Sequence, residues 1–185
     1  MGDPRRLRKQ YEKPPHPWMA ARIAEEKELM KEFGLRRKKE IWKAESILRR
    51  FRAQAKKLIA ARGEQEKKEG ELLLRKLIRL GLLHEGAKVE DVLDLNVRDI
   101  LNRRLQSVVF KKGLALSMKQ ARQFIVHKHI MVGDKKVNVP SYLVEKNEED
   151  KICFAPDSPF SKEDHVEISK LKKTEQKVEE VKQEG

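Results

Sequence analysis

The chain has a single cysteine, Cys153, among its 185 residues. One thiol cannot form an intrachain disulfide, and it cannot supply a zinc site that needs several thiolates. The residues around it, Lys-Ile-Cys-Phe, alternate polar and apolar side chains as a strand does. We therefore expect Cys153 to be a small buried apolar residue of that strand.

Long hydrophobic runs are also missing. No segment approaches the roughly 18 apolar residues of a membrane-spanning helix, and the first residues, Met-Gly-Asp-Pro-Arg-Arg, lack the apolar region of a secretory signal peptide. Aromatic residues make up only 5% of the chain. We expect Trp18 and Trp42 to pack between helices, since they do not form a row of membrane anchors. The sequence predicts a cytoplasmic protein with no membrane partner.

Signatures of catalysis and of metal binding are scarce. There is no G-x-x-x-x-G-K-[ST] loop for a nucleotide phosphate. His127 and His129 would share one face of a strand, but Cys153 alone is a poor third ligand. Ser141 and His129 lack the third group of a nucleophilic triad. We expect no metal, no cofactor and no enzymatic activity.

Positive charge is what the chain has in excess. Its 43 Lys and Arg residues against 30 Asp and Glu give a net charge of +13 and an isoelectric point near 9.8. The excess lies in two blocks, residues 1–62 and 99–142, which are separated by a nearly neutral segment. Two such blocks indicate a polyanionic partner that is contacted from two parts of the chain.

The first half of the chain predicts helices. Residues 1–17 are basic and rich in proline, which predicts an extended arm that becomes ordered on a partner. Apolar residues then recur at helical spacing over 18–33, 41–62 and 64–80, and a short helical turn is expected over 89–95. Gly34 and Gly63 suit the helix ends, and Pro17 suits a first helical turn.

The second basic block predicts two helices. Asn96 and Asp99 come close to a capping box, which predicts a helix that continues to residue 110. Ser117 and Gln120 form an S-x-x-Q box, so a second helix is expected to begin at Met118.

A small sheet should follow these helices. Residues 130–132 and 136–139 predict a hairpin with a type II′ turn at Gly133-Asp134, and Pro140 limits the second strand to a sheet edge. Residues 152–154 and 166–168 are candidate strands, and the alternating Lys and Glu from residue 170 predict a disordered tail.

The predicted fold class is α+β. The domains are an extended basic arm (1–17), a helical lobe (18–98), a small domain of two helices on a short, mainly antiparallel sheet (99–169, with its helix–helix–hairpin core at 101–144) and a charged flexible tail (170–185).

Several motifs of the small domain resemble the RNA-binding domain named after small-subunit ribosomal protein four. They are Arg103-Arg104-Leu105, Ser117, Gln120-Ala121-Arg122-Gln123, Ile125, His127, His129-Ile130, Val132, Val137-Asn138 and Pro140-Ser141-Tyr142.

A segment of the helical lobe adds to this resemblance. Residues 33–42, FGLRRKKEIW, are similar to the signature Y-G-L-[RK]-N-K-R-E-[LIV]-W of the ribosomal family itself, with Phe33 in place of tyrosine and Arg37 in place of asparagine. Residues 92–95 and 103–111 resemble the archaeal and eukaryotic branch of this uS-four family.

The resemblance spans residues 3–168, and it implies a primary rRNA-binding protein of the small ribosomal subunit. Such a protein would dock on a multi-helix junction of the rRNA, nucleate assembly of the subunit body and influence decoding accuracy. Its partners would be small-subunit rRNA, neighbouring ribosomal proteins at the mRNA entry region and mRNA, without self-association. The alternative is a translation factor or RNA chaperone with the same small domain, which would not need the 33–42 segment.

The candidate RNA-binding residues are basic side chains of the arm, helices and hairpin, together with polar residues of the motifs. They are Arg5, Arg6, Arg8, Lys9, Arg36, Arg37, Lys38, Lys39, Lys43, Arg49, Arg50, Arg52, Arg103, Arg104, Lys111, Lys112, Ser117, Lys119, Gln120, Arg122, Gln123, His127, Lys128, His129, Lys135, Lys136, Ser141 and Tyr142.

Overall fold

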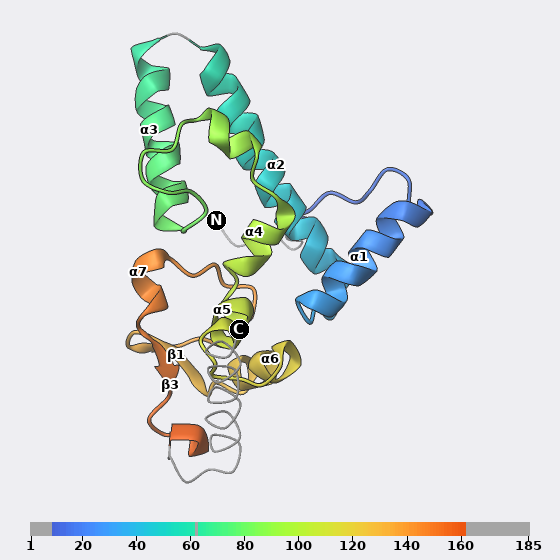
Figure 1. The fold of residues 1–185 in the computed structure, drawn as a ribbon, viewed down its shortest axis with the longest axis vertical. Coiled ribbons are helices and arrows are strands. Elements are labelled where there is room, and N and C mark those ends of the chain that lie inside the picture. The colour runs from blue at the N-terminus through green and yellow to red at the C-terminus, as the bar shows by residue number, and fades with distance from the viewer. Residues whose placement is uncertain (1–8, 62, 162–185) are drawn as a thin grey trace, which may run out of the picture. The chain divides into compact units, whose positions relative to one another are not determined.

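The computed structural model describes residues 9–61 and 63–161 (Figure 1). Contacts divide the described chain into two compact units. The N-terminal unit contains residues 9–77 and 83–101, and the C-terminal unit contains 78–82 and 102–161. The first is helical and the second combines helices with a small sheet, so the predicted α+β class is confirmed.

The N-terminal unit is built around one long helix, α2. Its elements are α1 (Ala20–Glu32), α2 (Lys38–Ala60), α3 (Glu64–Arg79), the 3₁₀ turn η1 (Glu90–Leu93) and α4 (Val97–Asn102), of which α3 and α4 run on into the C-terminal unit. Helix α2 buries Ile41, Ala44, Leu48, Phe51 and Ala55, a spacing of three and four residues that places them on one helix face. Figure 1 shows α3 beside α2, and the Lys76 ammonium lies 5.6 Å from the centre of the Phe51 ring.

The start of α1 differs from the prediction. The helix begins at Ala20, so Pro17 precedes its first turn, and Trp18 is 90% exposed instead of packing between helices. The Arg22 guanidinium donates hydrogen bonds to the backbone carbonyls of His16 and Pro17, at 2.9 and 2.8 Å. These bonds fold the chain into a turn before the helix, and Trp18 is left outside.

The single helix predicted to end at residue 110 is wrong, because the structure has two helices there. Helix α4 ends at Asn102 and α5 (Leu105–Lys111) follows it. Between them Arg104 is extended, with φ −72° and ψ 143°, and pairs as a β-bridge with Leu143. The Leu105 N–H donates to the Tyr142 carbonyl at 2.7 Å. The helix is thus interrupted because its backbone bonds to a later segment of the chain.

The C-terminal unit places α5 and α6 with a three-stranded sheet. Its further elements are α6 (Met118–Val126), β1 (Ile130–Val132), β2 (Lys135–Lys136), α7 (Lys146–Glu149), β3 (Ile152–Phe154) and the 3₁₀ turn η2 (Pro159–Ser161). The strand order is β2-β1-β3 and both pairings are antiparallel, with Met131 opposite Lys136 on one side and Cys153 on the other. The strand predicted at 166–168 and the tail lie outside the described residues.

Turn and cap chemistry agree with the sequence. In the hairpin turn, Gly133 has a positive φ of +58° and Asp134 does not. A type II′ turn requires this combination. The Ser117 hydroxyl accepts the Gln120 N–H at 3.2 Å, and the Gln120 side chain accepts the Leu116 N–H at 2.7 Å. The predicted capping of α6 is confirmed.

One hydrophobic core holds the C-terminal unit together. Its buried members come from α5, α6, strands β1 and β3 and two of the connecting segments; they are Leu105, Val108, Val109, Ala115, Ala121, Phe124, Ile125, Ile130, Val144 and Ile152. Cys153 is not among them. It is exposed, because Ile152 points into the core and the alternation of strand β3 turns the next side chain outward. The prediction of a buried cysteine is wrong.

No helix in the described part of the chain is long and apolar enough to cross a membrane.

Candidate RNA-binding surface

The predicted basic residues fall into two groups in the structure. Some are exposed and form no ion pair within the described chain, whereas others are bonded to the protein's own carboxylates or carbonyls. The first group can neutralise phosphates at no cost to the fold, and the second already has a structural role. Arg5, Arg6 and Arg8 lie outside the described residues.

The free group of the N-terminal unit lies in the turn before α2 and at the start of that helix. Arg36, Arg37, Lys39 and Lys43 are exposed, and none of them forms an ion pair with a residue of 9–61 or 63–161. They lie in or beside the first turn of α2. This short stretch thus gathers four cations without an ion pair among the described residues.

Lys38 belongs to the bonded group. Its ammonium lies 2.8 Å from the carboxylate of Glu26, which is only 2% exposed. Glu26 also accepts the Trp42 indole N–H at 3.0 Å and pairs with Arg22 at 3.5 Å. Burial alone would raise the pKa of Glu26, but the bonds from Lys38 and Trp42 outweigh it, so the pKa is lowered. This buried carboxylate joins α1 to α2.

Sequence reasoning did not single out Glu26, although a signal was present. Met19, Ile23 and Met30 recur at helical spacing in this segment of the sequence, and Glu26 lies at the same spacing. An acid on an apolar stripe predicts a buried partner of opposite charge.

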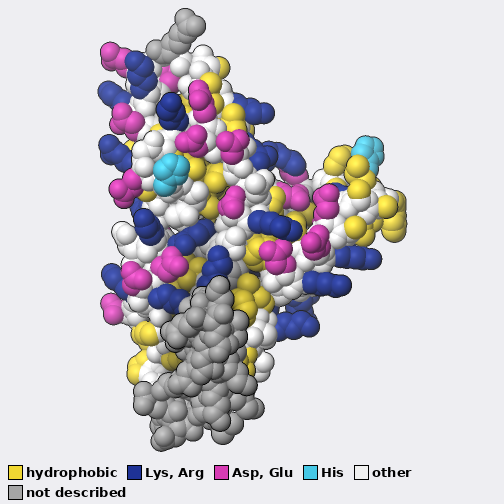
Figure 2. Space-filling view, in the orientation of Figure 1, with side chains coloured by type: hydrophobic (Ala, Val, Ile, Leu, Met, Phe, Trp, Pro, Cys, Tyr) yellow, Lys and Arg dark blue, Asp and Glu magenta, His cyan; other side chains and the backbone are white. Residues whose placement is uncertain are grey.

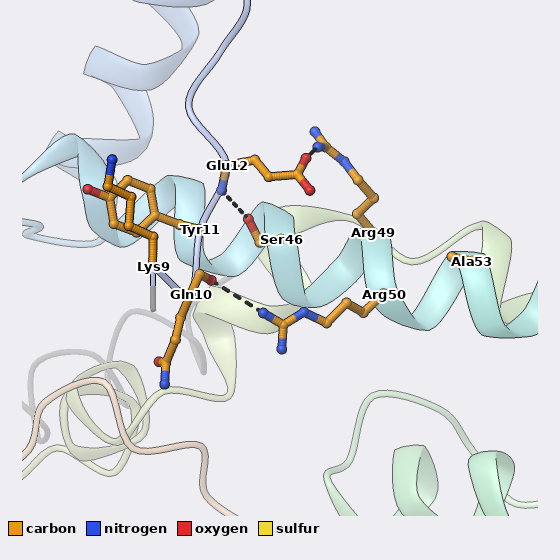
Figure 3. A pocket seen from close by; sticks show the side chains of 8 residues that line it. All are labelled: Lys9, Gln10, Tyr11, Glu12, Ser46, Arg49, Arg50 and Ala53. Carbon is orange, nitrogen blue, oxygen red and sulfur yellow. Dashed lines mark hydrogen bonds and ion pairs between the residues drawn. The ribbon is translucent and has the colours of Figure 1, made fainter. Parts of the chain in front are cut away.

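The described end of the arm crosses α2 and lies against it (Figure 3). The Glu12 N–H donates to the Ser46 hydroxyl at 3.1 Å, and the Glu12 carboxylate pairs with Arg49. The Arg50 guanidinium approaches the Gln10 carbonyl at 3.5 Å. These contacts border an open cavity of about 290 Å³ that is lined by Lys9, Gln10, Tyr11, Glu12, Ser46, Arg49, Arg50 and Ala53. Arg49 and Arg50 therefore bind the protein's own arm in this structure.

Arg52 is another bonded candidate. Its guanidinium donates to the backbone carbonyl of Leu95, which ties α2 to the segment after η1. Its main contact is internal.

The C-terminal unit has its own free group. Lys119, Gln123 and His127 are exposed at successive four-residue steps along α6, so they form one stripe on that helix, and the exposed Lys128 follows directly. At the end of α5, Lys111 is exposed and Lys112 is half-buried. In the hairpin, Lys135 is exposed. None of these lysines has an ion pair with a described residue.

Arg103 and Arg104 do not join that surface. Arg103 donates to the Glu149 carboxylate at 2.8 Å and to the Val144 carbonyl at 3.1 Å, and Arg104 is only 5% exposed. Both arginines therefore contact the protein itself, although they were among the RNA-binding candidates. Arg122 itself is half-buried and lies 3.4 Å from the side-chain oxygen of the buried Gln106.

Several polar candidates also have internal roles. The Tyr142 hydroxyl donates to Glu148 at 2.9 Å, and Lys136 pairs with Asp157 at 2.6 Å. His129 lies 3.0 Å from the buried Ser158 hydroxyl, and its pKa is lowered by burial and by the neighbouring His127. The Ser117 and Gln120 side chains cap α6, whereas Ser141 is exposed.

Acidic side chains are interspersed with the basic ones on the face shown in Figure 2, so its positive charge is local and not continuous. Apolar side chains gather at the outer end of α1, where Trp18 and Met19 are 90% and 56% exposed. Within the described residues, no three His, Cys, Asp or Glu side chains gather as a metal site would need.

Two protein-family models match successive parts of the chain. Residues 5–102 match the model described as "Ribosomal protein S4/S9 N-terminal domain", and residues 103–150 match the "S4 domain".

Three relatives share the name "Small ribosomal subunit protein uS4". The protein of Methanothermobacter thermautotrophicus is 52% identical over 163 residues, which covers 88% of this chain and 95% of the relative. That of Methanococcus aeolicus is 56% identical over 168 residues (90% and 95%), and that of Nanoarchaeum equitans is 52% identical over 176 residues (94% and 96%).

These archaeal relatives confirm the resemblance to the uS-four family and to its archaeal and eukaryotic branch. The first match covers most of the N-terminal unit and the second lies within the C-terminal unit. The alignments with the three relatives cover 88–94% of the chain, so they include parts of both units. The chain belongs to the family of small ribosomal subunit protein uS4.

Proposed function

We propose that this protein is a structural constituent of the small ribosomal subunit in the cytoplasm, and that it binds small-subunit rRNA through both of its units. Members of its family are ribosomal proteins and not enzymes. The observation that carries the proposal is the pair of free basic groups, one at the start of α2 and one along α6 and its end.

Each group suits phosphate contacts on folded RNA. Its lysines and arginines are exposed, apart from the half-buried Lys112, and form no ion pair with a described carboxylate, so RNA can replace their counterions without breaking an internal ion pair. Such contacts position a protein on RNA, and the shape of the RNA supplies much of the selectivity. A multi-helix junction offers several phosphate backbones close together, which suits a protein with two separate basic groups.

We further propose that docking on such a junction helps to nucleate the body of the subunit. Near the mRNA entry region the same protein would contact neighbouring ribosomal proteins and mRNA and influence decoding accuracy. These roles rest on the family resemblance together with the two basic groups.

Binding to a fragment of the 5′ domain of small-subunit rRNA tests the proposal. The full chain should prefer this fragment over random duplex RNA of matched length, and its affinity should fall steeply with salt. Lys39→Gln should weaken binding, whereas Arg75→Gln should not, because Arg75 belongs to neither free group and pairs with Glu71. Equal affinity for the random duplex would contradict specific rRNA recognition.

Association with the subunit is a second test. The protein should co-sediment with small ribosomal subunits through a high-salt wash, as a stably incorporated constituent does. Release of all the protein by such a wash would indicate a factor that binds transiently.

A further inference from the structure

Three helices of this protein end with the same hydrogen-bond pattern. At the end of α1, the Leu35 N–H donates to Met30 at 3.0 Å and the Gly34 N–H to Lys31 at 3.4 Å. At the end of α5, the donors are Leu114 and Gly113, and the acceptors are the carbonyls of Val109 and Phe110, at 3.2 and 3.0 Å.

Helix α6 ends in the same way. The His129 N–H donates to the Phe124 carbonyl at 2.9 Å, and the Lys128 N–H donates to the Ile125 carbonyl at 3.0 Å. This pair of bonds defines the Schellman motif, in which the residue just after the helix adopts the left-handed conformation.

The residue in the left-handed position differs among the three ends. It is Gly34 after α1 (φ +56°) and Gly113 after α5 (φ +72°), but it is Lys128 after α6 (φ +62°). Among the described residues, Lys128 is the one non-glycine residue with a positive φ. A β-carbon in this conformation is crowded by the backbone, so lysine is strained where glycine is not.

The surroundings of Lys128 hold this conformation in place. The next residue, His129, accepts the Ala155 N–H at 2.8 Å and lies 3.0 Å from the Ser158 hydroxyl. Its ring meets Phe124 edge-on, with centroids 6.2 Å apart, and Phe160 at 4.9 Å. The backbone direction at Lys128, and with it the start of the lysine side chain, is thus fixed by packed neighbours.

The lysine directly follows the exposed stripe of α6. Lys119, Gln123 and His127 precede it on one face of the helix, and Lys128 is exposed and has no ion pair within residues 9–61 and 63–161. A glycine at this position would complete the same turn without strain, but the surface would lose one positive charge. Strained residues that persist in a well-packed setting are concentrated at binding sites.

We propose that Lys128 is a phosphate-binding residue of the α6 stripe, and that its left-handed backbone directs the ammonium group toward the RNA at the expense of stability. The inference rests on the proposed function, since it names a contact within the same RNA-binding surface.

A purely structural role for the lysine gives a different expectation. Helix α6 has no basic residue in its last turn, whereas α1 and α5 have Lys31 and Lys111 there. A cation near a helix C-terminus is stabilising. If Lys128 serves only this purpose, its replacement by a neutral residue lowers stability and leaves RNA binding unchanged.

Three substitutions in the full chain separate these roles. Lys128→Gly removes the charge and the strain, Lys128→Gln removes the charge and keeps the strain, and Lys128→Arg keeps both. We measure the thermal midpoint, and the affinity for the 5′-domain rRNA fragment over a range of salt concentrations. Lys119→Gln serves as the matched control, since it removes a charge from the same stripe at a relaxed helical position.

Lys128→Gly should raise the melting temperature by about 2–4 °C and lower the rRNA affinity several-fold, with a salt slope smaller by about 0.7–0.9. Lys128→Gln should lower affinity to a similar extent without the gain in melting temperature. Lys128→Arg should behave as the natural chain, and Lys119→Gln should lose affinity without becoming more stable.

Two results would overturn the inference. Unchanged affinity and salt slope in Lys128→Gly would show that Lys128 makes no phosphate contact. A melting temperature that does not rise in this variant would show that the lysine is not strained. If the natural chain itself shows no preference for the rRNA fragment, the proposed function fails. If the natural chain prefers the rRNA fragment and the Lys128→Gly variant binds it equally well, only the proposed role of Lys128 is contradicted.

Discussion

Individual basic residues in this protein have different duties that charge alone does not reveal. Arg104 and Lys119 illustrate the contrast, because both were expected on the RNA-facing surface and both belong to the C-terminal unit. Arg104 is 5% exposed at the break between α4 and α5, whereas Lys119 is exposed on α6. The first should therefore matter for folding and the second for binding.

Replacing each of these residues by alanine tests that division. Arg104→Ala should lower the free energy of unfolding by about 2–3 kcal/mol, since it removes a buried side chain with its packing and its bonds. Lys119→Ala should change stability by less than about 0.5 kcal/mol and should weaken rRNA binding. Denaturant unfolding followed by circular dichroism, together with a binding titration, measures both quantities. A stable Arg104→Ala protein that has lost RNA binding would place Arg104 in the interface instead.

The cap of α6 gives a second prediction for single residues. Ser117→Ala removes the acceptor of the Gln120 N–H and should cost about 1 kcal/mol of stability. Ser141→Ala is the matched control, because Ser141 is exposed and caps no helix. Equal melting temperatures of the two variants would show that the cap contributes nothing.

At the scale of the elements, the contact between α1 and α2 depends on a buried charged group, the Glu26 carboxylate. Glu26 is ionised and bonded to Lys38 and Trp42, and its pKa is lowered. Nearby Glu45 is half-buried, and burial together with the charge of Glu26 raises its pKa. The two carboxyl groups therefore affect stability in opposite directions as pH changes.

The sign follows from linkage between proton binding and folding. Stability from ionised Glu26 is present above the ordinary glutamate pKa and is lost as the pH falls through the lowered pKa of the folded state. For Glu45, the folded state prefers the protonated form, so stability falls as the pH rises from the ordinary pKa through the raised one.

We expect Glu26→Gln to lower the melting temperature at pH 7, and Glu45→Gln to raise it. Both differences from the natural chain should shrink as the pH falls below about 4, where glutamates become protonated. Glu25→Gln, at an exposed position of α1, should have little effect at any pH. The idea fails if the two substitutions shift the melting temperature in the same direction at pH 7.

The same elements show how far a sequence can predict structure. Regular apolar spacing predicted α2, α3 and α6, and cap and turn residues predicted the start of α6 and the hairpin. The break at Arg104 could not be predicted, because it depends on pairing with Leu143 far along the chain. For the same reason the sequence could not separate bonded from free cations: Lys38 and Arg103 find their carboxylates on other elements.

For the molecule as a whole, the proposal requires that both units contribute to one binding event. The slope of log affinity against log salt counts the phosphates that are neutralised, at about 0.7–0.9 per contact. It therefore measures the contribution of each free basic group without any knowledge of how the two units are arranged.

Two double variants apply this measure. Arg37→Gln with Lys39→Gln, and Lys119→Gln with Lys128→Gln, should each reduce the slope by roughly 1.4–1.8. Their combination should reduce it by about the sum, since each neutralised phosphate contributes its own share of the slope. A combined variant no worse than one of the doubles would mean that a single unit makes the RNA contacts.

The exposed position of Cys153 on β3 makes this experiment easier to perform. It is the only thiol in the sequence, and its side chain is open to solvent beside Met131 on the small sheet. A maleimide dye would therefore attach at one known place in the C-terminal unit, with no engineered cysteine. Fluorescence anisotropy of that dye could follow RNA binding in every variant. Without a reductant, the same thiol could link two molecules covalently and give a false appearance of self-association.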